Sequence, residues 1–184
     1  MIDNPSRILA ALDRHLHAPF TLYVYGRSAL ALGYSAAPAA YRATMDVDAI
    51  LPARELAAIE ANEDFWQAQE QTNLELGDTG LYFTPLFEER QVILTPDWLE
   101  KTVALSGLGF RHLALRRPAT ADLVLTKMMR VDPQDREDIR FLTWQSDVTV
   151  EKVKNAVEQA ILPDVVEIRQ AFAENRIWLS TWLK

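Results

Sequence analysis

The sequence predicts an α+β fold, in which a small mixed sheet is flanked by helices and followed by a helical C-terminal part. Residues 21–25 are rich in β-branched and aromatic side chains, and residues 45–51 alternate acidic with apolar ones, so both predict strands. Apolar residues recur at helical spacing through much of the remaining chain. After Arg117-Pro118 helical patterns dominate. We therefore expect an α/β core at residues 1–117 and a helical part at residues 118–184, packed on the core or forming one single domain with it.

The N-terminal half alternates predicted helices and strands. Residues 6–16 carry isoleucine and leucine at helical spacing and predict an amphipathic helix. The strand at residues 21–25 stops at Gly26, and a short helix at residues 28–32 follows it. The strand at residues 45–51 comes next. The first strand therefore leads through a glycine turn directly into a helix.

The middle of the chain predicts helices and then a hairpin. One or two helices cover residues 53–74. Residues 81–87 and 91–94 look like two strands of a hairpin. Pro85 lies within the first of these strands and cannot donate a main-chain hydrogen bond, so we expect that strand at a sheet edge or with a bulge. A further short strand is predicted at residues 110–115.

The C-terminal part predicts four helices. Asp132-Pro133 marks the start of one of them, because Asp is a favoured N-cap residue and proline is tolerated at the first helical position. The four helical patterns cover residues 119–130, 132–144, 149–162 and 163–183.

Composition excludes several classes of site. The chain of 184 residues has no cysteine, which excludes disulfides, thiol catalysis and cysteine-ligated metals. Its three histidines form no HExxH pattern, so we expect no histidine-built metal site. Lys and Arg number 19 against 26 Asp and Glu, a net charge of −7 without the broad basic footprint of a DNA-binding protein. With no targeting segment and no apolar run near the roughly 18 residues of a membrane span, we expect a cytoplasmic protein without a membrane partner.

Asp46 and Asp48 are the strongest candidates for chemistry. Residues two apart on a strand project from the same face, roughly 6.5–7 Å apart along the chain. Such a pair suits oxygen-ligated metal ions, and Mg²⁺ prefers hard oxygen ligands, which it completes with water and substrate phosphate. The alternative is a solvated strand face, although Asp is depleted in strands.

Gly26-Arg27-Ser28 would complement this metal site. A turn at the start of a helix offers main-chain N–H groups to a phosphate, and Ser28 adds a hydroxyl. The alternative is a purely structural turn in which Ser28 caps the helix. Asp46 and Asp48 would thus hold the metal, and the Gly26-Arg27-Ser28 turn would hold the triphosphate.

The order of these pieces resembles the nucleotidyltransferase superfamily of polymerase-β type. A strand, Gly-x-Ser, a helix and then Asp-x-Asp on the next strand follow the order typical of that superfamily. Arg-x-Thr-x-Asp-x-Asp at residues 42–48, with Lys and Asp motifs at residues 127–138, is similar to the minimal nucleotidyltransferase-like proteins of bacteria, which are related to AbiEii-type toxins of toxin–antitoxin systems. The resemblance covers most of residues 21–142.

The resemblance implies a reaction and a set of site residues. It implies Mg²⁺ as cofactor, an NTP as substrate, an RNA such as tRNA or a protein as acceptor, and an antitoxin as partner. It assigns catalytic roles to Asp46, Asp48 and Lys127, with the two aspartates as metal ligands. It assigns substrate binding to Gly26, Ser28 and Asp135. The residues themselves add two candidates for substrate binding: Arg130, as a second cation aimed at the triphosphate beside Lys127, and Asp138, as the acidic partner of these cations.

Purely structural interpretations of residues 127–138 stay open. Lys127 and Arg130, one helical turn apart, are also typical of a solvated basic face. Asp135 fits a capping-box-like helix start, whereas Asp138 lies one turn further on and is expected to pair with Arg130 or Lys127.

Two departures from the family pattern keep a second function open. Arg27 stands where the family turn usually has a second glycine. A third carboxylate on a later strand is missing, because Glu88 and Glu89 fall in the predicted hairpin turn. A catalytically inactive protein that binds nucleotide or acts as an interaction module is therefore the alternative.

Overall fold

The computed structural model describes residues 3–183, and its internal contacts divide the chain into two compact units. The first unit comprises Met1–Glu88 and Val103–Arg117, and the second comprises Glu89–Thr102 and Pro118–Lys184. Residues 89–102 thus group with the C-terminal helices. Within residues 3–183, none of the helices combines the length and the apolar character needed to cross a membrane.

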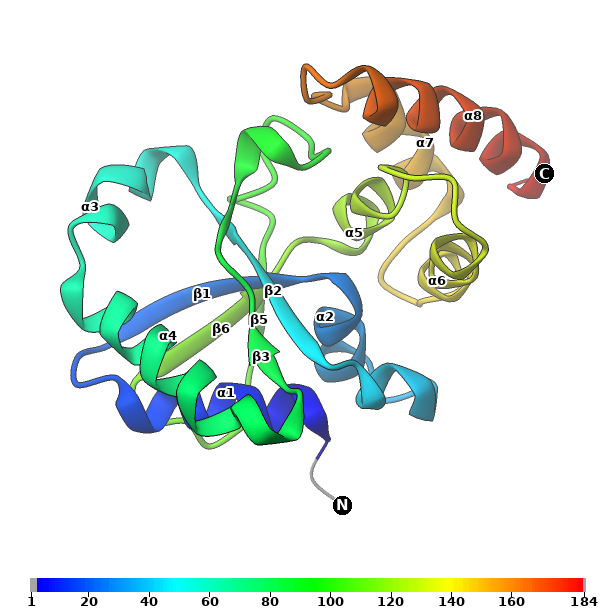
Figure 1. Cartoon of the computed structure of the whole chain (residues 1–184). Coiled ribbons are helices and arrows are strands. Elements are labelled where there is room, and N and C mark those ends of the chain that lie inside the picture. Colours follow the sequence, from blue (N-terminus) through cyan, green and yellow to red (C-terminus); the bar gives the residue numbers. More distant parts are fainter. Residues whose placement is uncertain (1–2, 184) are drawn as a thin grey trace. The chain divides into compact units, whose positions relative to one another are not determined.

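A six-stranded mixed sheet forms the centre of the first unit (Figure 1). Its strands are β1 (Phe20–Tyr25), β2 (Asp46–Leu51), β3 (Tyr82–Phe83), β4 (Phe87–Glu88), β5 (Val103–Leu105) and β6 (Leu113–Arg117). The strand order is β3-β2-β1-β6-β5, and β4 also pairs with β2. β1 runs antiparallel to β2 and parallel to β6, and β5 runs antiparallel to β6. The predicted α+β class with a small mixed sheet is confirmed.

Helices α1 (Asn4–His15), α2 (Gly26–Gly33), α3 (Leu56–Glu60) and α4 (Glu63–Leu76) complete the first unit. α1 packs against α4, and α1 and α2 both pack on β2 (Figure 1). The helical spacing of α1 buries Ile8, Leu9 and Leu12 completely, and each such side chain contributes roughly 1.5–3 kcal/mol. Asp3 caps this helix by accepting a 2.7 Å hydrogen bond from the main-chain N–H of Ser6.

The predicted hairpin at residues 81–94 is wrong. β3 and β4 both run parallel to β2, and Pro85 lies in the interruption between them at the edge of the sheet. Ile93 and its two neighbours are buried in the second unit and form no strand, although Leu94 makes one isolated bridge to Ile161. A short apolar run does not reveal whether its partner is a strand or a group of helices.

Four helices form most of the second unit: α5 (Thr120–Thr126), α6 (Pro133–Thr143), α7 (Val150–Gln159) and α8 (Val166–Trp182). The predicted start of α6 is confirmed, because Asp132 caps the N–H groups of Gln134 and Asp135, and Pro133 opens the helix. Thr149 caps α7 in the same way through the N–H of Lys152.

The helix predicted over residues 119–130 ends early, at Thr126. Lys127 is the C-cap residue of α5, so Lys127 and Arg130 do not lie one turn apart on a helix. The completely buried Asn175 of α8 donates hydrogen bonds to the carbonyl oxygens of Met128 and Arg130, at 3.3 and 2.9 Å. These tertiary hydrogen bonds take carbonyl groups that a longer helix would use internally.

Asp13, near the end of α1, anchors that helix to the start of β6. Its Oδ1 accepts hydrogen bonds from the main-chain N–H groups of His112 and Leu113, both at 2.8 Å, and its Oδ2 accepts one from Arg111 at 2.9 Å. Burial alone would raise the pKa of Asp13, but these three donors hold it below its usual value of 3.8.

We expect Asp13→Asn to lower the free energy of unfolding by about 1 kcal/mol near neutral pH, because its neutral amide oxygen accepts the two hydrogen bonds from His112 and Leu113 more weakly and its NH₂ group cannot accept the one from Arg111. Folding lowers the pKa of Asp13, so the carboxylate stabilises the fold above pH 3.8 and loses this contribution as the pH falls through the lowered pKa. Urea denaturation across this pH range measures the difference, with the exposed Asp78→Asn as control. A deficit that is equal at every pH would contradict this account.

Candidate functional site

β2 presents two carboxylates on one face. Asp46 and Asp48 stand at the first and third positions of the strand, and both are half-buried. Val47 between them is completely buried. Because side chains alternate between the faces of a strand, Asp46 and Asp48 project from the same side.

Asp48 lies against the turn that joins β1 to α2. Tyr25, the last residue of β1, is the cross-strand partner of Asp48. The next residue, Gly26, has a φ of 66°, a left-handed conformation that favours glycine. A Cβ at Gly26 would lie 3.2 Å from Oδ2 of Asp48. The lack of a side chain therefore allows this carboxylate to approach the first residue of α2.

Asp46 lies between two hydroxyl groups. Thr44 Oγ1 donates a 2.8 Å hydrogen bond to Oδ1, and the Tyr82 hydroxyl lies 3.5 Å from Oδ2. The charge of Asp46, then burial and the charge of Asp48, raise the pKa of Tyr82 above its usual value. Sequence reasoning missed Tyr82, because only the pairing of β3 with β2 makes it the cross-strand neighbour of Asp46.

Ser28 and Arg27 follow Gly26 in the first turn of α2. The Ser28 side chain is buried, and its hydroxyl donates a 2.9 Å hydrogen bond to the carbonyl oxygen of Tyr25. The Arg27 guanidinium lies over the ring of Tyr41 at 5.0 Å. Since the Ser28 hydroxyl donates to the main chain, a phosphate bound at this turn would be contacted by main-chain N–H groups.

The other predicted site residues form a charge cluster in the second unit. Lys127 Nζ lies 3.1 Å from Oδ1 of Asp135 and 2.7 Å from Oδ2 of Asp138. Arg130 also pairs with Asp135, and this hydrogen bond raises the pKa of Arg130. The expected pairing of Asp138 with one of the two cations is thus observed. We call Lys127, Arg130, Asp135 and Asp138 the charge quartet.

Burial distinguishes the members of the charge quartet. Lys127 is 7% exposed, Asp135 is 3% exposed and Asp138 is completely buried, so Lys127 does not lie on a solvated basic face. The Arg130 side chain, in contrast, is 69% exposed. Two positive and two negative charges compensate each other, which burial requires. Asn175, which sequence reasoning missed, holds the main chain of this segment and accepts a 3.2 Å hydrogen bond from Arg136.

The predicted site residues thus fall into two groups. Gly26, Ser28, Asp46 and Asp48 lie together in the first unit, and the charge quartet lies in the second. Among residues 3–183, no group of three or more histidine or acidic side chains is placed to hold a metal ion. A cation bound at β2 would therefore take protein ligands from Asp46 and Asp48, and its remaining ligands from water or substrate.

We expect Lys127→Met to lower the free energy of unfolding by about 3–5 kcal/mol, because it removes the buried ammonium that Asp135 and the completely buried Asp138 share. Guanidinium denaturation measures the loss, and Lys154→Met, at an exposed position of α7, is the matched control. Adding Asp138→Asn to Lys127→Met should restore part of the stability. A Lys127→Met protein as stable as its control would show that the charge quartet does not support the fold.

Comparison with known proteins identifies one family. A family model described as "Nucleotidyltransferase of unknown function (DUF6036)" matches residues 9–174. No curated protein and no solved structure matches the chain. The match spans both the carboxylate pair of β2 and the charge quartet, so the nucleotidyltransferase family predicted from the sequence is confirmed, while the relationship to AbiEii-type toxins stays a prediction. This chain belongs to the DUF6036 family of nucleotidyltransferases.

Proposed function

We propose that this chain is a magnesium-dependent nucleotidyltransferase that transfers a nucleotide from an NTP to an RNA or protein acceptor. One observation carries the proposal: Oδ2 of Asp48 lies 3.2 Å from the position that a Cβ of Gly26 would take, at the start of α2. Within the first unit, a pair of carboxylates therefore adjoins a helix start. Nucleotidyl transfer needs both elements, because Mg²⁺ is bound by carboxylates and substrate phosphates together.

The carboxylates of β2 fit Mg²⁺. Asp46 and Asp48 offer hard oxygen donors from one strand face and retain partial exposure to solvent. Thr44 holds Oδ1 of Asp46, whereas among residues 3–183 the hydrogen-bonding contact of Oδ2 is the long 3.5 Å one with Tyr82, so Oδ2 is the better placed oxygen for a cation. Mg²⁺ bound here would neutralise charge that develops on the transferred phosphoryl group.

The start of α2 would hold the phosphates of the NTP. The first N–H groups of a helix have no acceptor within the helix, and the positive end of its dipole favours an anion. Gly26 leaves space beside Asp48. Arg27 is fixed over Tyr41 and adds a positive charge in the same turn. This turn thereby positions the triphosphate without the Ser28 hydroxyl.

In the charge quartet, Arg130 is the cation that solvent and substrate reach most easily. We propose that it contacts the triphosphate and that Asp135 orients it. Lys127 would act on phosphate by exchanging one of its two carboxylate partners for the substrate. Asp138 would then keep the Lys127 ammonium in place, since it lies at 2.7 Å.

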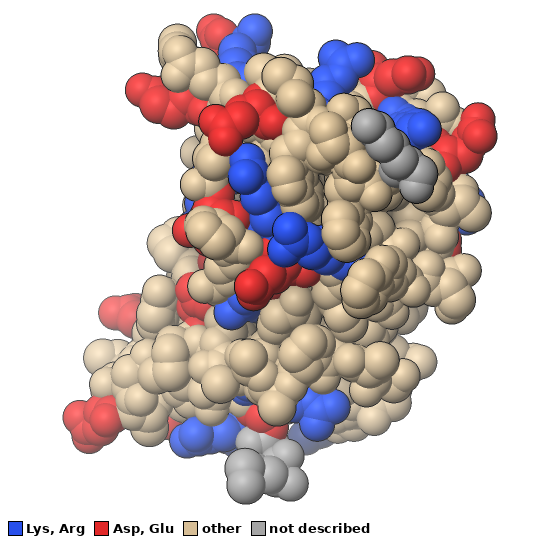
Figure 2. Space-filling model, turned by 90° about the vertical axis from the view of Figure 1, so that its right-hand side faces the viewer, with Lys and Arg blue, Asp and Glu red and all other residues tan. Residues whose placement is uncertain are grey.

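An RNA end, tRNA included, and a protein hydroxyl are the two proposed acceptor classes, and the reaction would take place in the cytoplasm. On the face drawn in Figure 2, Lys and Arg are interspersed with Asp and Glu. With 19 Lys and Arg against 26 Asp and Glu in the chain, an RNA would meet local basic sites and not a broad basic surface. The support for a toxin-like role with an antitoxin partner is the resemblance of residues 42–48 and 127–138.

A catalytically inactive nucleotide-binding or interaction module is the second candidate. It is favoured by the buried Ser28 hydroxyl and by a β2 site with two carboxylates and no third ligand among residues 3–183. Such a protein would bind NTP without releasing pyrophosphate.

Transfer of label from each radioactive NTP to total RNA or to protein, with Mg²⁺, tests the activity. We expect Asp48→Asn to reduce transfer by about 100-fold or more, because it removes a ligand of the Mg²⁺ that would neutralise charge in the transition state. Asp78→Asn, an exposed carboxylate in the same unit, should leave transfer unchanged. Magnesium-dependent NTP binding without transfer to any acceptor would favour the inactive module, and transfer that survives Asp48→Asn would contradict the proposed metal site.

Gly26→Ala tests the close approach of the turn to Asp48. The left-handed φ would cost about 1–2 kcal/mol of stability with a side chain present, and the new Cβ would press on Oδ2 of Asp48. We expect a higher Mg²⁺ requirement for transfer in addition to lower stability. Gly77→Ala is the matched control, because its φ is −51° and its Cβ would meet no atom within 4 Å. Equal magnesium dependence of the two variants would contradict this geometry.

A further inference from the structure

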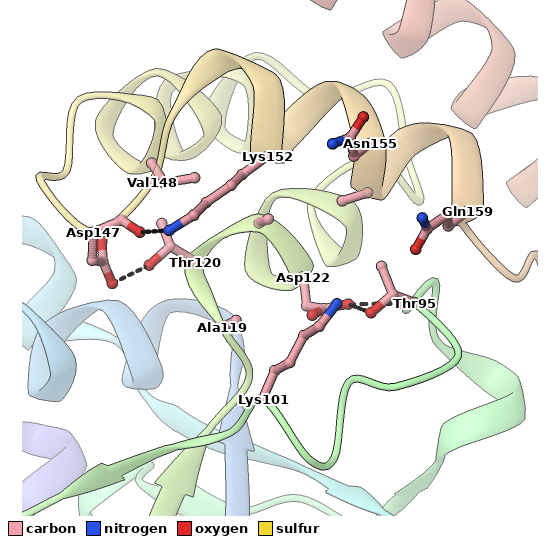
Figure 3. Close-up of a pocket in the computed structure, with 12 residues that line it drawn as sticks. Thr95, Lys101, Ala119, Thr120, Asp122, Asp147, Val148, Lys152, Asn155 and Gln159 are labelled. Atoms are coloured by element: carbon pink, nitrogen blue, oxygen red, sulfur yellow. Dashed lines mark hydrogen bonds between the residues drawn. The ribbon is translucent and has the colours of Figure 1, made fainter.

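The second unit contains a pocket apart from the residues of the proposed reaction. Figure 3 shows it between α5, α7 and the segment at residues 89–102, and its volume is about 410 Å³. This lies within the roughly 300–1,000 Å³ that is typical of sites for small organic ligands. Part of its wall is apolar, formed by Ala119, Val148 and Ala156. Such a wall suits a flat ring better than a small ion.

A buried carboxylate lines the pocket. Asp122 is 2% exposed, and its Oδ1 accepts two hydrogen bonds from Thr95, one from the main-chain N–H and one from the hydroxyl, both at 2.8 Å. Within the described part of the chain, both hydrogen bonds to Asp122 end on this oxygen, which leaves Oδ2 as an acceptor. Burial raises the pKa of this carboxyl group. Oδ2 is not among the described side-chain atoms that are fully enclosed without a partner, and Asp122 lines the pocket, so this oxygen is open to a ligand that brings an N–H group.

Two cations also line the pocket. Lys152 Nζ donates to the neutral main-chain carbonyl of Asp147 at 3.2 Å, and no carboxylate within residues 3–183 pairs with it. Lys101 pairs with Asp97 at 2.7 Å, but about half of each side chain is exposed, so this ion pair contributes little to stability. Lys152 on α7 and Asp122 on α5 thus offer a positive charge and a hydrogen-bond acceptor from different elements (Figure 3).

We propose that this pocket binds a nucleotide whose base carries an exocyclic amino group. The amino group donates to Oδ2 of Asp122, the ring packs on the apolar wall, and the phosphate pairs with Lys152, whereas Lys101 lies at the Asp122 end of the pocket (Figure 3). The side chain of Asp147 is occupied, because Thr120 donates to its Oδ2 at 2.7 Å. The proposal does not depend on nucleotidyl transfer, because every residue involved belongs to the second unit.

AMP and purine riboside 5′-monophosphate are a minimal pair of probes, since the second lacks the amino group and is otherwise the same molecule. Isothermal titration calorimetry of the full chain should show AMP binding about tenfold more tightly, the value of one hydrogen bond. The same preference should persist in Asp48→Asn, which disables the carboxylate pair of β2. Equal binding of the two probes, or loss of AMP binding in Asp48→Asn, would overturn the proposal.

Asp122→Asn is the most informative variant. Its amide oxygen can still accept the hydrogen bonds from Thr95, so the fold should persist, but an NH₂ donor then replaces Oδ2. We expect AMP to lose its tenfold advantage, because two donors would face each other. An unchanged preference for AMP in this variant would overturn the proposal.

Lys152→Ala gives a second test that leaves Asp122 intact. It should weaken both probes about equally, by about tenfold, because the phosphate contact is common to them. Lys154→Ala, at an exposed position two residues further along α7, should change neither. Equal effects of Lys152→Ala and Lys154→Ala would show general charge attraction and would overturn the phosphate contact.

Discussion

The antiparallel pairing of β1 with β2 is the constraint on which the candidate active site depends. Its register sets Asp48 opposite Tyr25, so the carboxylate faces the residue at which β1 ends and α2 begins. The left-handed Gly26 then turns the chain sharply without placing a Cβ against Oδ2 of Asp48. A shift of one residue in this register would move both carboxylates to the opposite face of the sheet, away from the helix start.

The second unit is organised by buried polar contacts. The charge quartet brings three almost fully buried charged groups together, which is tolerated only because opposite charges and hydrogen bonds compensate their lost hydration. Asn175 holds the main chain of the same segment. Asp122 likewise is a buried carboxylate stabilised by hydrogen bonds: the two that it accepts from Thr95 hold residues 89–102 against α5. A substitution at Lys127 is therefore expected to change the stability of the fold as well as any contact with substrate. The activity of such a variant is to be interpreted together with its measured stability.

The family match and the geometry carry different parts of the functional argument. The match to a nucleotidyltransferase family establishes the family over most of the chain. The proposal of Mg²⁺ and of the phosphate-binding groups rests on chemistry at β2 and α2, and the proposal of the acceptor rests on the resemblance alone. The buried Ser28 hydroxyl donates to the carbonyl oxygen of Tyr25, so in the proposed function main-chain N–H groups would make the phosphate contact. Arg27 at the same turn would then contribute positive charge.

The sequence by itself determined the α+β class, the strand that carries Asp46 and Asp48, and the start of α6 at Asp132-Pro133, because local periodicity and capping preferences act over a few residues. It did not reveal that β3 and β4 run parallel to β2, that α5 ends at Thr126, or that Tyr82 adjoins Asp46. These features depend on partners distant in the chain. β3 and β4 pair with β2, and Asn175 donates hydrogen bonds to the carbonyl groups that follow α5. Asp122 on α5 accepts the hydrogen bond that attaches residues 89–102 to the helices. Only the tertiary structure decided them, since pairing and burial between remote segments override local preference.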